Sequence, residues 1–196
     1  MNDLALLVNA ARAAGDIASR YFNNAPAVTD KPDGAGPVTE ADLAVNAMLE
    51  NTLQSARPDY GWLSEETEDS TARRGTKRQF VIDPIDGPRA FIEGSKDWAH
   101  SLAIVEEGVV IAGAVYMPQR DLMFAASLGR GATCNNAPIT VTDPNVHDAT
   151  VLGARTNLEP RFWKSGLVPP FIRTFRPSLA YRLCFVAQGR FDGMMS

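Results

Sequence analysis

Apolar residues near the start of the chain recur at intervals of three and four, the pattern of an amphipathic helix. They are Leu4, Leu7, Val8, Ala11, Ala14, Ile17, Ala18 and Tyr21. A second helix is predicted after Thr39, because Thr39 and Asp42 fit a capping box ahead of a further apolar series. Between the two helices, residues 23–37 are rich in proline, glycine and aspartate. We expect a mobile loop there.

The middle of the chain reads as a sheet. Short apolar runs at Trp62–Ser64 and Phe80–Ile82 predict buried strands, and longer runs at 98–105, 109–116 and 122–126 predict antiparallel strands. Near residue 147 the pattern changes. A strand at 150–155, a helix-like segment, a strand at 172–175, a helix at 179–188 and a strand at 190–195 follow in turn. This alternation favours an α/β arrangement, so we expect an N-terminal α+β domain over 1–147 and an α/β domain over 148–196.

Carboxylates follow two of the predicted strands. Asp83 and Asp86 come after Phe80–Ile82, in a stretch that Pro84 and Gly87 predict to be a turn. Such a turn allows both carboxylates and the carbonyl of Ile85 to converge on one point, which would suit a hard cation. The alternative is a polar β-turn whose aspartates cap their own backbone.

Glu65 and Glu66 follow the other strand, as a solvated surface pair or as a source of a third carboxylate. Oxygen ligands without cysteine or histidine select Mg²⁺ or Mn²⁺ over zinc. Pro88 is placed to begin a short helix, whose N-terminus would suit a phosphate.

Composition narrows the functional classes. A net charge of −4 and a pI near 5.2 argue against a nucleic-acid-coating surface. With two cysteines, no basic leader and no apolar run of membrane-spanning length, we expect a soluble, cytoplasmic protein. His100 and His147 have no other ligand-type residue at metal-site spacing, so both are interpreted as core or surface histidines.

Several motifs in order resemble the inositol monophosphatase family of Mg-dependent, lithium-sensitive phosphatases. They are Pro37–Asp42, Glu65-Glu66, Asp83-Pro84-Ile85-Asp86-Gly87 with Phe91, Gly113–Tyr116, Gly129–Ala132 with Cys134-Asn135, and Leu183–Asp192. The resemblance covers nearly the whole chain. It implies a layered α-β-α-β-α sandwich with the site between its halves, a C-terminal α/β half that is incomplete here, and a homodimer.

The resemblance also implies roles for individual residues. Glu65, Asp83 and the carbonyl of Ile85 would bind one metal ion, and Asp83 with Asp86 a second. Glu65 would also orient the attacking water, and Asp42, besides capping its helix, would help to hold water around a weakly bound ion. Gly87 and Pro88 occupy the phosphate-binding positions, and Lys31 is either an exposed loop lysine or faces the site. The implied reaction is hydrolysis of a small-molecule phosphate monoester by a metal-activated water.

The chain departs from the family pattern at two places. The family usually has threonine at the position of Pro88, where its hydroxyl and N–H assist the reaction. Family members also continue past the position of Ser196 to a Trp-Asp segment that supplies a metal ligand, and inositol-acting members carry a glutamate at the Ser196 position. The substrate therefore stays open among inositol phosphates, histidinol phosphate and 3′-phosphoadenosine phosphates, and a catalytically weakened binder of metal or phosphometabolite is the alternative.

Overall fold

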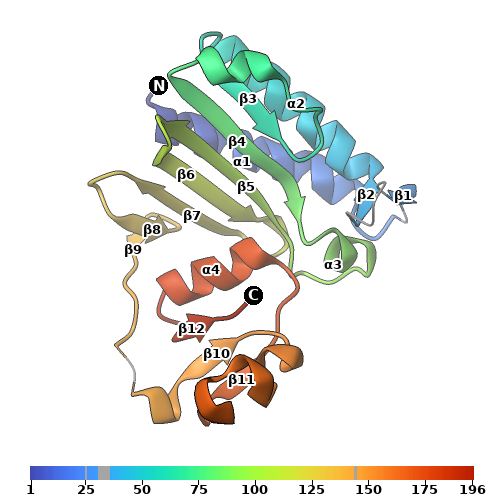
Figure 1. Cartoon of the computed structure of the whole chain (residues 1–196). Helices are drawn as coiled ribbons and strands as arrows, with labels where there is room; N and C mark the ends of the chain where they lie inside the picture. Colours follow the sequence, from blue (N-terminus) through green and yellow to red (C-terminus); the bar gives the residue numbers. More distant parts are fainter. Residues whose placement is uncertain (25, 31–35, 144) are drawn as a thin grey trace.

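Helices and sheets alternate in layers in the computed structural model, which describes residues 1–24, 26–30, 36–143 and 145–196 (Figure 1). Helices α1 (Asp3–Tyr21) and α2 (Glu40–Ala56) cover one face of a seven-stranded sheet. Helix α4 (Leu179–Ala187) lies on the other face, and a three-stranded sheet follows beneath it. The predicted layered combination of α+β and α/β structure is confirmed.

Both N-terminal helices begin at the caps that their sequences supply. The Asn2 side chain accepts a hydrogen bond from the backbone of Ala5 at the start of α1. At α2 the predicted capping box is present: the Thr39 hydroxyl accepts from the Asp42 backbone, and the Asp42 carboxylate accepts from the Thr39 N–H at 2.8 Å. These contacts satisfy N–H groups that a helix start leaves unpaired.

The large sheet keeps its strands in chain order, β3 to β9. The strands are β3 (Gly61–Ser64), β4 (Arg78–Asp86), β5 (Ala99–Glu106), β6 (Val109–Met117), β7 (Leu122–Ser127), β8 (Ala132–Cys134) and β9 (Ala137–Pro138). All neighbours are antiparallel except β3 and β4, which are parallel and are linked through a 3-10 turn at Thr71–Gly75. The β5–β6 hairpin turns at Glu107 and Gly108, whose positive φ angles of 49° and 85° suit the twist of a two-residue hairpin loop.

Two sequence expectations were wrong in detail. Instead of a loop throughout 23–37, strand β1 (Val28–Asp30) pairs antiparallel with β2 (Pro37–Thr39). Residues 31–35, including Lys31, lie outside the described residues. In addition, Asp83–Asp86 is not a turn: β4 continues to Asp86 through an irregularity in its pairing with β5.

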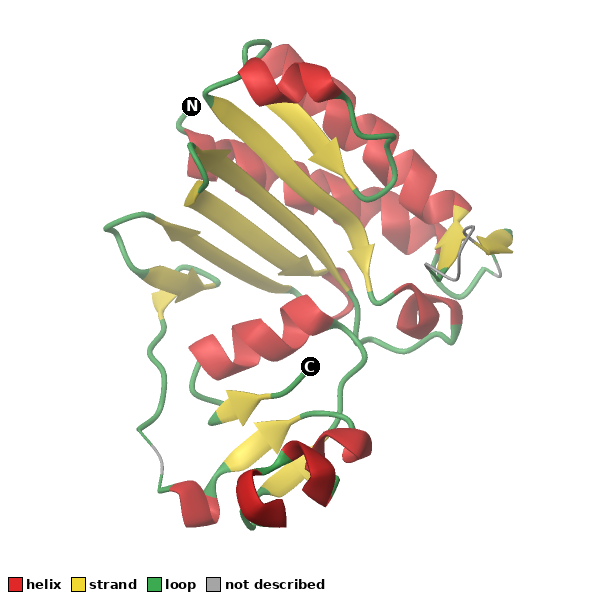
Figure 2. Ribbon diagram, viewed as in Figure 1, coloured by secondary structure: helices red, strands yellow, loops and turns green. Residues whose placement is uncertain are grey.

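The C-terminal part forms a parallel sheet in the order β11-β10-β12, as its alternating pattern indicated. Its strands are β10 (Thr150–Leu152), β11 (Ile172–Thr174) and β12 (Gly193–Met194). The helix-like segment between β10 and β11 consists of three short 3-10 turns, at Arg155–Leu158, Pro160–Phe162 and Lys164–Gly166 (Figure 2). Proline at 160 and at 169–170 breaks the helical pattern there.

Two apolar clusters hold the layers together. The first fills the space between the large sheet and α1 and α2. The second joins the other sheet face to α4 and β10, with Phe185 packed edge-on against Phe124 at 6.0 Å. The two parts of the chain therefore share this second core.

In the described part of the chain, no helix combines the length and apolar character needed to cross a bilayer.

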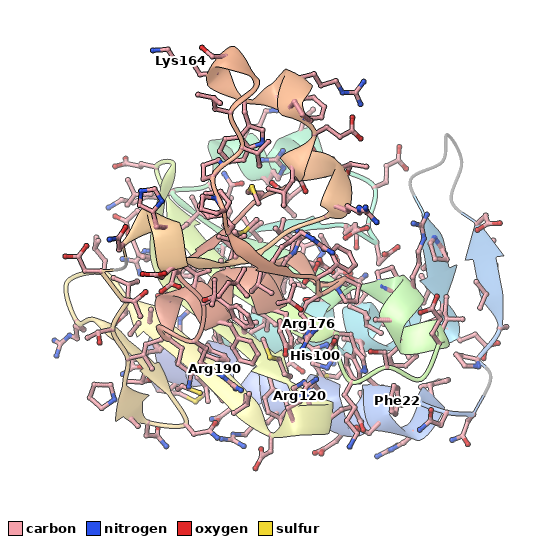
Figure 3. All side chains as sticks on the ribbon, turned by 90° about the horizontal axis from the view of Figure 1, so that it is seen from below. Phe22, His100, Arg120, Lys164, Arg176 and Arg190 are labelled. Carbon is pink, nitrogen blue, oxygen red and sulfur yellow. The ribbon has the colours of Figure 1, made fainter. Side chains whose placement is uncertain are left out.

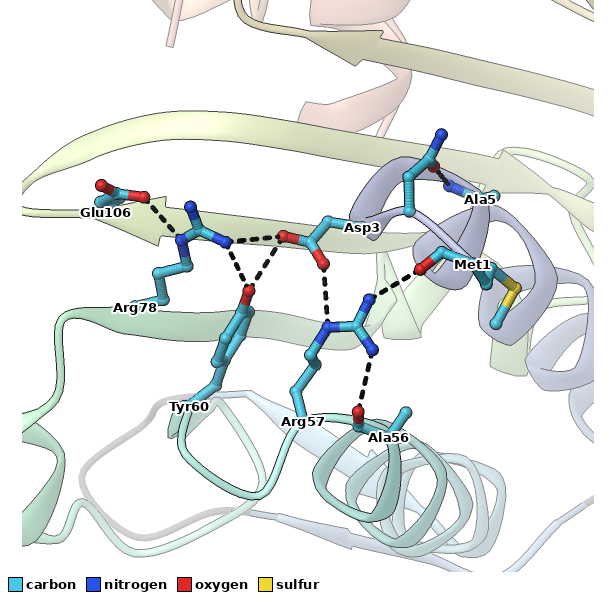
Figure 4. A network of polar contacts seen from close by, with 9 residues as sticks. Met1, Asp3, Ala5, Ala56, Arg57, Tyr60, Arg78 and Glu106 are labelled. Atoms are coloured by element: carbon cyan, nitrogen blue, oxygen red, sulfur yellow. Dashed lines mark hydrogen bonds and ion pairs between the residues drawn. The ribbon is translucent and has the colours of Figure 1, made fainter.

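A polar network ties the start of the chain to the sheet at the end far from α3 (Figures 1 and 4). The Asp3 carboxylate accepts hydrogen bonds from Arg57 at 3.1 Å and from the Tyr60 hydroxyl at 3.0 Å. Arg78 donates to Tyr60 at 2.7 Å and to Glu106 at 2.6 Å. Helix α1, the end of α2 and strands β4 and β5 are thus fixed relative to one another.

Candidate active site

The end of β4 carries two of the predicted site carboxylates. Asp83 pairs with Ser101 of β5 and Asp86 pairs with Ala99, so Pro84 and Ile85 together lie opposite the single residue between them on β5. Two residues opposite one is the definition of a β-bulge. The sequence suggested a turn here because proline and glycine punctuate both kinds of irregularity.

The bulge changes which face each side chain occupies. Side chains three positions apart on a regular strand point to opposite faces. Ile82 and Ile85 are three apart, yet both lie in the core cluster under α1 and α2. The extra residue therefore places Asp83 and Asp86 together on the opposite face, toward α4.

Glu65 and Glu66 lie in the turn after β3, next to the same stretch of β4. The Glu65 N–H donates to the carbonyl of Ile82 at 3.1 Å. The turn is held to α2 by Asn46, which accepts from the Ser64 hydroxyl at 2.6 Å and donates to the Thr67 hydroxyl at 2.9 Å. Sequence reasoning missed Asn46, because its place on the inward face of α2 gives no signal of a partner twenty residues away.

Negative charge is concentrated around Asp83. Its pKa is raised from the ordinary 3.8 to about 8, first by burial and then by the carboxylates of Asp86, Glu65, Asp42 and Glu66, in that order of effect. The structure thus brings together the four acids predicted from the sequence, with Glu66 as a fifth.

Asp42 has the structural role that the capping pattern predicted. It is 2% exposed, and its carboxylate accepts hydrogen bonds from both the backbone and the hydroxyl of Thr39. Burial raises the pKa of Asp42 to about 6, assisted by the charge of Glu66, while the Thr39 hydrogen bonds oppose the rise. The carboxylate is therefore both a helix cap and a contributor to the acidic field at Asp83.

Asp86 anchors the start of α4. Its Oδ2 accepts hydrogen bonds from the Ser178 hydroxyl and from the Ala180 N–H at 2.7 Å, and its Oδ1 accepts from the Leu179 N–H at 3.3 Å. An ionised carboxylate has about four lone-pair positions, so Oδ1 keeps capacity for a further partner. A carboxylate at a helix N-terminus also interacts favourably with the helix dipole.

Gly87 makes the close approach between the two parts of the chain possible. Its φ is 91°, a left-handed conformation, and a Cβ there would lie 3.2 Å from the Asp97 carbonyl and 3.2 Å from the Ser178 Cβ. Pro88 then begins the five-residue helix α3 (Pro88–Ile92), as predicted.

A cluster of ionic contacts, not foreseen from the sequence, closes the same junction. Asp97, before β5, forms ion pairs with Arg120 and, at 3.4 Å, with Arg176. The two arginines are labelled in Figure 3. Arg176 also donates to the Tyr181 hydroxyl of α4 at 3.4 Å, and the Arg120 guanidinium lies 5.3 Å from the Tyr181 ring centre. These groups are far apart in the chain and become neighbours only in the fold.

An open cleft of about 520 Å³ adjoins Asp86. Its lining includes Asp86, Gly87, Pro88, Arg89, Phe175 and Pro177. Phe175 is 46% exposed, and the Arg182 guanidinium lies 5.8 Å from its ring centre. The cleft thus places an aromatic wall beside a carboxylate of the acidic cluster.

The donor set fits a hard divalent cation. In the described residues, no three acidic, histidine or cysteine side chains are gathered closely enough to chelate an ion by themselves. Magnesium at phosphate sites is usually held by one or two carboxylates together with substrate oxygens and water. Asp83, Asp86 and the carbonyl of Ile85 offer donors of that kind, and the crowded negative charge at Asp83 favours a cation.

Comparison with known proteins decides the family. The family model described as the inositol monophosphatase family matches residues 2–196. The chain belongs to the inositol monophosphatase family. Members of this family are phosphatases and are generally metal-dependent, so the resemblance drawn from the motifs is confirmed.

Curated members of the family differ in their named activity. A histidinol-phosphatase from Mycobacterium tuberculosis is 33% identical over 205 residues, covering 97% of this chain and 76% of the relative. An inositol-1-monophosphatase from Rhizobium meliloti is 29% identical, covering 97% and 74%. Nus factor SuhB from Escherichia coli is 28% identical, with the same two shares.

Solved structures in this family share the fold. The extragenic suppressor protein suhB of Bartonella henselae superimposes with a TM-score of 0.86 at 28% identity, covering 97% of this chain and 76% of that one. An IMPase from Thermotoga maritima gives a TM-score of 0.85 at 25% identity, covering 97% and 74%. The layered sandwich predicted from the family resemblance is therefore the observed one.

Proposed function

We propose that this chain hydrolyses a small-molecule phosphate monoester in a Mg²⁺-dependent reaction, with Mn²⁺ as a possible substitute. The observation that carries the proposal is Asp83, which is half-buried among four other carboxylates and has its pKa raised to about 8. Such crowding of like charges is costly unless a cation neutralises it. When bound, the ion would lower the pKa of the attacking water and withdraw charge from the phosphate.

Each predicted site residue has a role in this proposal. Asp83, Asp86 and the carbonyl of Ile85 would hold the cation, with Glu65 as a further ligand and as the group that orients the water. The Gly87 N–H would donate to the phosphate, next to Pro88 at the first turn of α3. Asp42 would cap α2 and help to hold water around a weakly bound ion.

The cleft beside Asp86 favours a leaving alcohol that carries a flat ring. Phe175 and Pro177 give it an apolar wall, and Arg89 and Glu93 add charges of opposite sign to its lining. A flat heteroaromatic ring can stack on Phe175, whereas a polyol would need several hydrogen-bonding groups. Histidinol phosphate, the substrate class named for the relative from Mycobacterium tuberculosis, is the first candidate, and inositol 1-phosphate is the second.

The test is phosphate release from histidinol phosphate, inositol 1-phosphate, 3′-phosphoadenosine 5′-phosphate and fructose 1,6-bisphosphate, with Mg²⁺ or with EDTA. EDTA-sensitive release from one ester supports the proposal and names the substrate class. Phe175→Ala should raise KM for ring-bearing esters by about tenfold and leave inositol 1-phosphate unchanged, as expected for a lost stacking contact of about 1–3 kcal/mol. Equal effects on all four esters would contradict the ring preference.

A second candidate function is binding of a metal or phosphometabolite without turnover. Pro88 favours it, because proline offers neither a hydroxyl nor an N–H at the position where the family usually has threonine. Tight, Mg²⁺-dependent binding of an ester that is never hydrolysed would identify this function. Three further properties stay predictions: homodimer formation, cytoplasmic location and the lack of a nucleic-acid partner. Relatives over the same span include Nus factor SuhB, so the third prediction needs its own test.

A further inference from the structure

His100 lies at the one position of β5 that faces the bulge in β4. Its neighbours Ser101 and Ala99 pair with Asp83 and Asp86, and His100 alone stands opposite Pro84 and Ile85. It pairs on its other side with Tyr116 of β6, so its backbone is fixed within the sheet. The side chain is fully buried.

The imidazole makes a specific contact with the bulge. Its Nδ1 is hydrogen-bonded to the carbonyl oxygen of Pro84. A bulge leaves its extra residue without a regular ladder partner. Because a carbonyl can only accept, Nδ1 carries the proton, and the imidazole supplies the donor that the interrupted ladder does not.

The rest of the ring shows that packing alone does not account for this histidine. Nε2 is buried and has no hydrogen-bond partner in the described structure, which is a cost that an apolar side chain would avoid. Burial lowers the pKa of His100 to about 4, so the ring is neutral and brings no charge toward the acids. The favourable contribution of the imidazole therefore lies in the Nδ1 contact.

We propose that His100 is a positioning residue for the cation site: its Nδ1–H holds the Pro84 carbonyl, and thereby the bulge that turns Asp83 and Asp86 to the same face of the sheet. The inference rests on the proposed function, because it takes these two carboxylates and the adjacent Ile85 carbonyl as cation ligands. Without the donor, the Pro84 carbonyl would be buried unpaired, and β4 would relax toward a regular register. That register directs Asp86 away from Asp83.

The test compares two substitutions that differ in the donor. His100→Asn places an amide N–H near the position of Nδ1, and His100→Leu removes the donor while keeping similar bulk. Binding of Mn²⁺ is measured directly by the electron paramagnetic resonance signal of the free ion, and the Mg²⁺ concentration for half-maximal phosphate release is measured alongside. We expect His100→Leu to raise the dissociation constant for Mn²⁺ and the half-maximal Mg²⁺ concentration at least about tenfold each, equivalent to about 1.4 kcal/mol. His100→Asn should stay within about threefold of the unsubstituted protein.

Ile104→Val supplies the matched control, because Ile104 is fully buried in the same strand away from the bulge. It should lower the unfolding temperature but leave Mn²⁺ binding unchanged. If His100→Leu does not fold, the smaller donor-free His100→Val replaces it. Unchanged Mn²⁺ binding in the donor-free variant, equal weakening in all three variants, or absence of Mn²⁺ binding by the unsubstituted protein would each overturn the inference.

The direct binding measurement separates this inference from the proposed function. If no ester is hydrolysed, but the protein binds Mn²⁺ and loses that binding selectively in His100→Leu, the positioning role stands and the phosphatase proposal fails. If esters are hydrolysed with an unaltered Mg²⁺ requirement in His100→Leu, the phosphatase proposal stands and the positioning role fails.

Discussion

Burial and repulsion by neighbouring carboxylates both raise the pKa of Asp83. In metal-free protein its folded-state pKa of about 8 lies above the ordinary 3.8. The stability that it contributes is therefore fully present below about pH 4 and is lost as the pH rises through 8. The buried His100, whose pKa is lowered from 6.5 to about 4, opposes this loss, because its unfolded form still binds a proton near pH 6.5; this opposing effect fades as the pH rises further.

We therefore predict that the unfolding temperature in EDTA falls between pH 6.5 and about 8.5, and that Asp83→Asn flattens this fall. Calorimetry of both proteins across this interval measures the effect. Adding Mg²⁺ should restore stability most at the alkaline end, where the carboxylates are charged. An equally steep fall in Asp83→Asn would show that another group titrates.

A second prediction concerns the effect of Pro88 on the reaction rate. Pro88→Thr restores a hydroxyl and an N–H at the start of α3, and one preorganised donor typically contributes about a hundredfold or more to kcat. We expect kcat for the best ester to rise at least about tenfold, since the proline has been accommodated by its surroundings. Pro88→Ala restores the N–H alone and should give a smaller rise. If neither variant exceeds the unsubstituted protein, the missing donor does not limit turnover.

At the scale of elements, the turn after β3 depends on α2. Asn46 holds the hydroxyls of Ser64 and Thr67 on either side of the two glutamates. Asn46→Ala should cost about 1–3 kcal/mol of unfolding free energy, because it leaves a buried hydroxyl without its partner. It should also raise the Mg²⁺ requirement by loosening Glu65.

Asn51→Ala is the control for this prediction, since Asn51 is exposed on the same helix. Urea denaturation gives the stability of each variant, and phosphate release against Mg²⁺ concentration gives the requirement. Equal stability of the two variants would mean that the Asn46 contacts do not hold the turn.

Elements with a strong local signal could be predicted from the sequence, and contacts between distant elements could not. The three-and-four periodicity of α1, the capping box of α2, the strand followed by Glu65 and the strand that ends at Asp86 are all local patterns. The β1–β2 pairing was missed because the residues around it favour turns. The 3-10 turns after β10 were interpreted as a helix because apolar residues there recur at helix-like intervals.

The candidate site follows the same division. Asp42, Glu65, Asp83 and Asp86 could be named because acids at strand ends and a cap pattern are visible in the chain. The bulge and its His100 contact could not, because they depend on the register between β4 and β5. Because no other ligand-type residue lies at metal-site spacing from it, His100 was interpreted from the sequence as a core or surface histidine.

At the scale of the whole molecule, the predicted boundary near residue 147 separates two parts that share a core. Phe185 of α4 is 1% exposed, lies 4.1 Å from the Tyr181 ring centre and packs against Phe124 of the large sheet. Phe185→Ala should cost about 3–5 kcal/mol, through lost burial and a cavity. We expect a single unfolding transition in the unsubstituted protein and in Phe185→Ala.

Urea unfolding followed by tryptophan fluorescence and by circular dichroism tests this expectation, because Trp62 and Trp98 report on the large sheet and its helices and Trp163 reports on the C-terminal part. Coincident curves, shifted together by Phe185→Ala, would show one cooperative unit. Two separated transitions would instead support independent domains over 1–147 and 148–196.

The most direct test of the central claim is Mg²⁺-dependent phosphate release by the unsubstituted protein and by Asp83→Asn, on the ester that the panel selects. Asp69→Asn, in an exposed ion pair with Arg73, is the matched control. The account predicts release that EDTA abolishes, a loss of at least about a hundredfold in Asp83→Asn and no loss in Asp69→Asn. Release that persists in EDTA, or an Asp83→Asn protein with full activity, would contradict it.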